Sequence, residues 1–229
     1  MVHVIKLEFN SNPNVGFYGV ATDKFCLLGK SVPKKHIKKI EEALKVPVVQ
    51  ANVYGTSLIG IFAVGNSKNL LLPKVIFKRE LEEIKKKLKP LKINIDVLDS
   101  KETALSNNIL VNDKVGIISP VFPKDEIKKI EECLKVKVIQ TQLAHSTVPG
   151  SAGILTNKGA IFHMDLSDEE IKKVEKLLGF EIGIGSVNMG NPWVRSGVIA
   201  NSKGFLVGNL SSGYEIARID ESLGFIKKI

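Results

Sequence analysis

The stretch VPVVQANVYGTSLIGIFAVGNSKNLLLP, residues 46–73, decides the fold because its pattern recurs along the whole chain. The lysine of its polar turn, Lys68, has counterparts every 44 to 46 residues at Lys24, Lys114, Lys158 and Lys203. An apolar triad at the helical spacing i, i+3, i+7 follows each turn: Ile37/Ile40/Leu44, Leu81/Ile84/Leu88, Ile127/Ile130/Leu134, Ile171/Val174/Leu178 and Ile216/Ile219/Leu223. Two separate features that share one period indicate a structural unit copied five times.

The five units account for almost all of the 229 residues. We place them at approximately 1–45, 46–90, 91–135, 136–179 and 180–229. A unit of this size cannot bury its own apolar face, so neighbouring units must pack on one another. The sequence therefore predicts a single domain over residues 1–229.

Within one unit the sequence predicts a small sheet with one helix laid on it. In the second unit we expect strands over 46–54, 58–65 and 69–73, with the tight turn Asn-Ser-Lys at 66–68. The apolar triad then gives a helix with one buried stripe. Ser167 with Glu170, and Ser212 with Glu215, fit the capping box that marks a helix start.

The two ends of the chain decide between an open stack and a closed ring. The chain begins with a bare strand at 3–9 and ends in a short apolar segment at 224–229. We interpret these segments as two halves of the one missing connecting strand, because pairing them removes exposed sheet edges. The predicted fold is α/β: a closed ring of five β-β-β-α units with fivefold pseudosymmetry, sheets inside and helices outside.

The chain is basic, with a net charge of +9 and a pI near 9.4. This charge suggests an anionic partner. However, many lysines alternate with glutamates, as in KKIEE at 38–42 and 128–132, which is also typical of a solvated helix face. No apolar run is long enough to span a membrane, and the start lacks the layout of a secretion signal. We expect a cytoplasmic protein.

The sequence shows no catalytic motif. It has no phosphate-binding loop, no HExxH and no CxxC, and its four histidines do not share metal-ligand spacing. Cys26 and Cys133 occur in regular elements and read as core-side residues. We expect no catalytic residue, cofactor, metal or small-molecule substrate. The alternative is a guanidino-group hydrolase or transferase of the pentein architecture, which needs a loop cysteine, a histidine and acidic residues at the axis.

Three segments carry a resemblance to a known family: VGNSKNLLLP (64–73), DSKETALSNNILVNDKVGIISP (99–120) and GSVNMGNPWVRSGVIANSKGFLVG (185–208). They resemble translation initiation factor 6, over nearly the whole chain. Ser106 is a departure, because an Ala-Leu-Gly-Asn string is expected at 104–107. The chain also lacks the acidic, serine-rich tail of eukaryotic members and therefore looks archaeal.

The resemblance implies a binding function rather than turnover. Such a factor, acting as a monomer, binds the large (50S) ribosomal subunit and prevents its association with the small (30S) subunit. It is also implicated in ribosome biogenesis, in the maturation of the large subunit. Its partner is ribosomal protein, ribosomal RNA or both. A general basic RNA-binding scaffold is a further alternative that the sequence leaves open.

The loops between the first two strands of each unit should gather at one end of the ring. They vary between units, whereas the hairpin turns stay alike, and variation on a repeated scaffold favours function. They supply the candidate ribosome-binding residues Gly16, Asn107, Asn108, Ser151, Asn191, Trp193 and Arg195. Trp193 and Arg195 form the candidate anchor pair. Alternatively, Trp193 folds back over the mouth of the ring, and Gly16 serves only the turn instead of admitting a partner's backbone.

Overall fold

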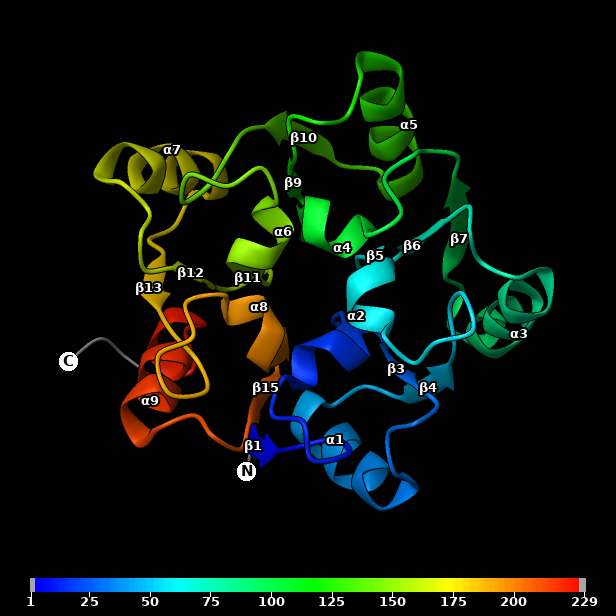
Figure 1. Ribbon diagram of the computed structural model, residues 1–229, viewed down its shortest axis with the longest axis horizontal. Coiled ribbons are helices and arrows are strands. Elements are labelled where there is room, and N and C mark those ends of the chain that lie inside the picture. The colour runs from blue at the N-terminus through cyan, green and yellow to red at the C-terminus, as the bar shows by residue number, and fades with distance from the viewer. Residues whose placement is uncertain (1–2, 227–229) are drawn as a thin grey trace.

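The computed structural model describes residues 3–226, and its strands form five separate three-stranded sheets arranged around one axis (Figure 1). The first four sheets are β2 (Gly19–Ala21), β3 (Cys26–Gly29) and β4 (Val48–Ala51); β5 (Val64–Gly65), β6 (Asn69–Pro73) and β7 (Asn94–Leu98); β8 (Ile109–Val111), β9 (Val115–Ile118) and β10 (Lys137–Gln140); β11 (Gly153–Leu155), β12 (Ala160–His163) and β13 (Gly183–Gly185). The fifth combines β14 (Val198–Asn201) and β15 (Gly204–Gly208) with β1 (Val4–Leu7). The predicted five-unit α/β fold is confirmed.

Every sheet has the same topology. The inner strand pairs with the middle strand in an antiparallel hairpin, and the third strand pairs parallel to the middle strand. The inner strands β2, β5, β8, β11 and β14 contact one another around the axis. One long helix per unit lies on the outside of the ring: α1 (Ile37–Leu44, after the 3-10 turn η2, Lys34–His36), α3 (Lys78–Leu88, before η3, Lys89–Leu91), α5 (Lys124–Leu134), α7 (Asp168–Leu178) and α9 (Gly213–Ser222).

The apolar triads pack against the preceding unit as well as their own. Ile40 and Leu44 of α1 join Leu206 of the fifth sheet in one buried cluster. In the same way, Ile130 of α5 is buried against Leu71 of β6. Each outer helix therefore covers the gap between its own sheet and the preceding one. This packing explains why the triad recurs with the period of the sheet.

The ring closes through the first strand of the chain. Val4–Leu7 pairs parallel with Phe205–Gly208 of β15, so the first strand meets the last, as expected. The prediction that 224–229 supplies half of the closing strand is wrong for its described part, because β1 alone occupies that edge. Phe225 instead stacks on the ring of His3, with 4.9 Å between centroids. Residues 227–229 lie outside the described residues.

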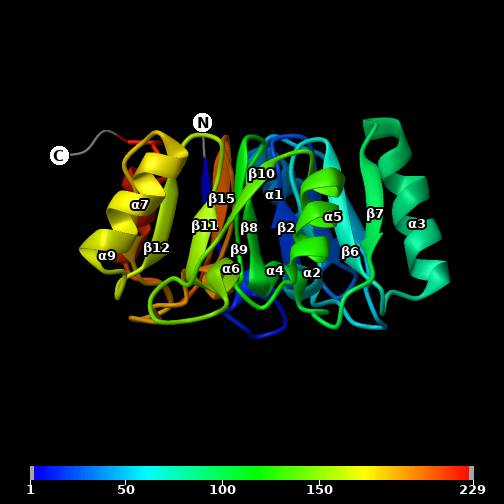
Figure 2. The same cartoon turned by 90° about the horizontal axis from the view of Figure 1, so that it is seen from above.

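Each inner strand is preceded by a one-turn helix that the sequence analysis missed. The segment 58–65, predicted as one strand, contains such a helix. The prediction failed here because a short apolar run does not distinguish strand from helix. These turns are η1 (Val15–Tyr18), α2 (Ile59–Phe62), α4 (Leu105–Asn108), α6 (Pro149–Ala152) and α8 (Val194–Gly197). They contact one another in a closed circle at one end of the axis, the short-helix end (Figures 1 and 2).

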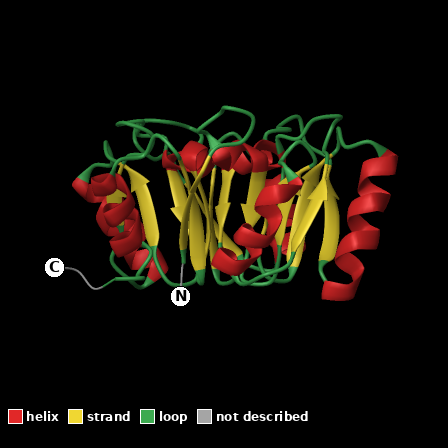
Figure 3. Cartoon of the chain, turned by 90° about the horizontal axis from the view of Figure 1, so that it is seen from below, coloured by secondary structure: helices red, strands yellow, loops and turns green. Residues whose placement is uncertain are grey.

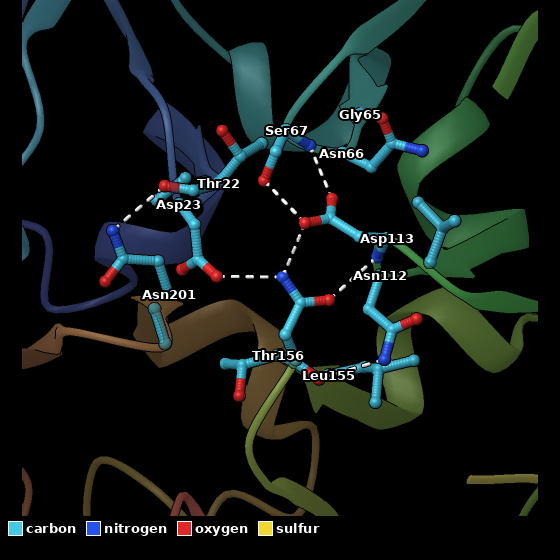
Figure 4. A pocket seen from close by; sticks show the side chains of 14 residues that line it. Thr22, Asp23, Gly65, Asn66, Ser67, Asn112, Asp113, Leu155, Thr156 and Asn201 are labelled. Carbon is cyan, nitrogen blue, oxygen red and sulfur yellow. Dashed lines mark hydrogen bonds between the residues drawn. The ribbon is translucent and has the colours of Figure 1, made fainter. Parts of the chain in front are cut away.

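The five hairpin turns lie at the opposite end, where β1 also begins (Figure 3). Polar side chains close the axis there (Figure 4). Asn157 Nδ2 donates to carboxylate oxygens of Asp23 (2.8 Å) and Asp113 (2.7 Å), while Ser67 and Ser202 donate to the same two carboxylates. The space left between them is only about 20 Å³. The hairpin end is thus tied together across the axis.

No helix within residues 3–226 has both the length and the apolar character that crossing a membrane requires.

A candidate binding surface at the short-helix end

The short helices interlock through their second residue. A Cβ atom on Gly16 would overlap the carbonyl oxygen of Arg195 and lie 2.8 Å from that of Ser196. Gly60 faces the carbonyl oxygen of Gly16 in the same way, and Gly150 faces that of Ser106. Glycine is required at these positions because each backbone approaches the preceding unit too closely for a side chain.

A depression of about 410 Å³ opens at this end of the ring. It is lined by Asn14, Phe17, Gly60, Ile61, Asn107, Val148, Ser151, Asn191, Trp193, Arg195 and Ser196. Five of the seven residues suggested by the sequence thus meet in one place. The repeat also relates residues that the sequence analysis missed, because Phe17, Ile61 and Ser196 occupy the same third helix position as Asn107 and Ser151.

Gly16 and Asn108 do not line the depression. Gly16, in η1, is buried against the main chain of α8. Its missing side chain therefore serves the packing of these two helices. Asn108 is 5% exposed. Its amide turns toward the carbonyl oxygen of Ala104 (3.4 Å) and the carboxylate of Glu102 (3.5 Å). Both residues thus lie outside the depression, and their role in ribosome binding stays a prediction.

Arg195 holds a positive charge at the mouth of the ring. It occupies the second position of α8, where three other units have glycine, and its Nη2 donates to Ser106 Oγ at 2.6 Å. Burial lowers the pKa of its guanidinium to about 10, and its Nε has no partner within the described residues. Ser106, the departure noted in the sequence, has ordinary helical backbone and supplies the acceptor.

Trp193 forms one wall of the depression and also packs inward. Its ring meets His163 edge to face, with 4.8 Å between centroids, and it contacts the apolar cluster of the fourth unit. His163 is 5% exposed, and burial lowers its pKa although the nearby Asp165 opposes the shift. The indole thus packs against the fourth unit and also lines the depression.

Capping-box carboxylates fix the loop that carries Trp193. Glu215 accepts from the backbone of Ser212 at the start of α9, and also from Gly190 N (2.9 Å) and Met189 N (3.3 Å). Burial raises the pKa of Glu215, but the hydrogen bonds from Ser212 and Gly190 outweigh it and leave the pKa below its usual range. Glu80 and Glu170 hold the equivalent loops of two other units. The candidate surface is therefore supported by rigid connections to the outer helices.

Comparison with known proteins identifies the family. Residues 4–222 match the model of the eIF-6 family. The chain belongs to the eIF-6 family. A protein of Pyrococcus abyssi named Translation initiation factor 6 is 39% identical over 227 residues, which cover 98% of this chain and 100% of the relative. The protein of the same name from Pyrococcus horikoshii is 40% identical with the same coverage.

A comparison with solved structures gives one weak similarity. Dimethylarginine dimethylaminohydrolase, in an adduct with S-methyl-L-thiocitrulline, has a TM-score of 0.48 and 12% sequence identity over 92% of this chain and 73% of its own. In the present chain, both cysteine thiols have a raised pKa. Burial, together with Glu41, raises the pKa of Cys26 far above its usual range, and burial with Asp96 raises that of Cys133. No described group of three or more His, Cys, Asp or Glu side chains is arranged to hold a metal ion.

Proposed function

We propose that this chain is a translation initiation factor that binds the large (50S) ribosomal subunit and prevents its association with the small (30S) subunit. We also propose that it takes part in large-subunit maturation. The observation that carries the proposal is the family match over residues 4–222, together with relatives named Translation initiation factor 6 that align from end to end. It acts as a cytoplasmic monomer and by occupying space, not by turnover.

The short-helix end is the surface that fits this task best. It offers an apolar and polar depression with a tryptophan wall and a half-buried arginine, the residue types that dominate interface hot spots. The interlocked backbone leaves little to order on binding, so less conformational entropy is lost. The two cysteines support a role without catalysis, because nucleophilic thiols need a lowered pKa or an adjacent base.

Sedimentation of purified subunits tests the proposal directly. The protein should migrate with the large subunit and not with the small one, and joined ribosomes should decrease in proportion. Trp193→Ala should weaken large-subunit binding by about 30-fold, which corresponds to about 2 kcal/mol for an interface hot spot. Phe225→Ala is the matched control, since it removes a partly buried aromatic ring at the hairpin end. Migration with the small subunit, or unchanged subunit joining, would contradict the proposal.

A further inference from the structure

A basic groove runs along the outer wall of the second unit, away from the short-helix depression. It lies between the last turns of α3, the turn η3 and the start of β7, on the outer rim of the ring (Figure 1). Its volume is about 660 Å³. The residues that line it are Glu82, Lys85, Lys86, Lys89, Lys92, Ile93, Asn94 and Ile95. Four lysines thus face one concave surface that contains a single carboxylate.

Three of these lysines are uncompensated. Lys85 forms an ion pair with Glu82, with 3.6 Å between its Nζ and Oε1 of the carboxylate. The exposed Lys86, Lys89 and Lys92 have no ion pair or side-chain hydrogen bond within residues 3–226. Spacings of three and four residues bring like charges together on one face, which destabilises the helix by a few tenths of a kcal/mol per pair. A position near the helix C-terminus offsets part of this cost through the macrodipole.

Another outer helix shows how this chain balances the same number of lysines. Along α7, Lys172, Lys173 and Lys176 stand among Asp168, Glu169 and Glu175. In addition, Lys173 Nζ donates to Thr141 Oγ1 at 2.9 Å. Lys172 and Lys176 also make no ion pair within residues 3–226, but α7 itself carries more carboxylates than lysines, whereas the groove lysines have only Glu82 among them. The lysines of α7 therefore lie on a charge-balanced helix, while those of the basic groove leave an excess of positive charge.

We propose that the basic groove binds the phosphate backbone of RNA. Mobile ammonium groups neutralise phosphates without reading base sequence, which suits a contact that positions the protein on a folded RNA. The start of β7 is fixed to a hairpin turn, because Asn94 N donates to the carbonyl oxygen of Lys68 at 2.9 Å, so this edge of the groove is anchored to the ring. The inference rests on the proposed function, to which it adds an RNA contact on a second face.

Salt dependence of large-subunit binding separates this contact from a protein contact. Each lysine that neutralises a phosphate steepens the fall of log K against log salt by about 0.7 to 0.9. The variant Lys86→Gln/Lys89→Gln/Lys92→Gln should therefore reduce that slope by about 2 to 3. The matched control, Lys172→Gln/Lys173→Gln/Lys176→Gln, removes the same charge from α7 and should keep the wild-type slope. Arginine at the three groove positions should also keep it.

The outcomes distinguish this inference from the proposed function. If the wild-type protein fails to sediment with the large subunit, the proposed function fails. If it sediments but the groove variant keeps the wild-type slope, the RNA contact is refuted and the function stands. A labelled RNA hairpin of unrelated sequence should bind through the groove, whereas preferential groove-dependent binding of polyglutamate would identify an acidic protein and overturn the proposal. The groove variant should unfold at an equal or slightly higher midpoint than the control variant, because all six lysines are exposed and the groove variant loses its like-charge pairs.

Discussion

Substitution of Gly16 by alanine tests whether the short helices interlock as described. The added methyl group would overlap the carbonyl oxygen of Arg195 and approach that of Ser196 to 2.8 Å. Both obstacles are main-chain atoms, so no side-chain rotation relieves the overlap and η1 must move away from α8. Overpacking of this kind costs about 1 to 3 kcal/mol, while alanine regains about 0.4 to 1 kcal/mol by restricting the unfolded chain. Because main-chain atoms cannot rotate away, the upper end of the overpacking range applies, and we expect a net loss of about 2 kcal/mol.

The assay is guanidinium chloride and thermal unfolding followed by far-ultraviolet circular dichroism. A loss of about 2 kcal/mol corresponds to a melting temperature lower by about 4 to 8 °C in a chain of this size. Gly213→Ala is the control, because a Cβ at the start of α9 meets nothing within 4 Å and should slightly stabilise the protein. Equal midpoints for the two variants would refute the interlock. Weaker subunit binding with unchanged stability would restore the view that Gly16 admits a partner's backbone.

Three further predictions concern the site and the thiols. Burial lowers the pKa of His163, so the folded state favours the neutral ring, and its contribution to stability should be full above about pH 6.5 and fall as pH decreases. His163→Gln should therefore reduce the difference between unfolding midpoints measured at about pH 7 and pH 5, while the lowered pKa of His36 leaves part of that difference in place. Arg195→Gln should weaken large-subunit binding at least tenfold in sedimentation. Ser106→Ala removes the hydrogen bond to Arg195 but keeps the charge, so it should chiefly lower the free energy of unfolding, by about 1 to 3 kcal/mol in denaturant melts. The double variant Cys26→Ala/Cys133→Ala should retain subunit binding, and any activity on guanidino compounds that disappeared with these thiols would favour the enzyme alternative.

Much of the fold could be predicted because its signals are periodic. The triad that includes Ile40 and the turn lysines repeat with the sheet, so the number of units and the position of each outer helix follow from sequence. The one-turn helices could not be found in this way. They span four residues each and start without a side-chain cap, so neither periodicity nor capping chemistry marks them. The tail at 224–226 was misassigned because its apolar character suits packing against His3 as well as a strand.

The candidate site was predicted in part for a related reason. Variation between loops pointed to Trp193, Arg195 and their neighbours, and these residues do line one depression. Accessibility was a different matter, because it depends on which way a one-turn helix faces. In the one-turn helix α4, Asn107 faces the depression while the next residue, Asn108, turns back into its own loop. Composition alone does not separate two adjacent asparagines.

The geometry of the short helices separates stability from recognition. Their second positions are fixed by backbone contact between units, as at Gly16, Gly60 and Gly150. Their third positions all face the depression and carry five side chains of differing size and polarity: Phe17, Ile61, Asn107, Ser151 and Ser196. Because the frame is held by the second positions, the third positions can vary without disturbing the ring. A surface built in this way is preorganised, so its affinity depends on which side chains it presents and little on the cost of ordering them.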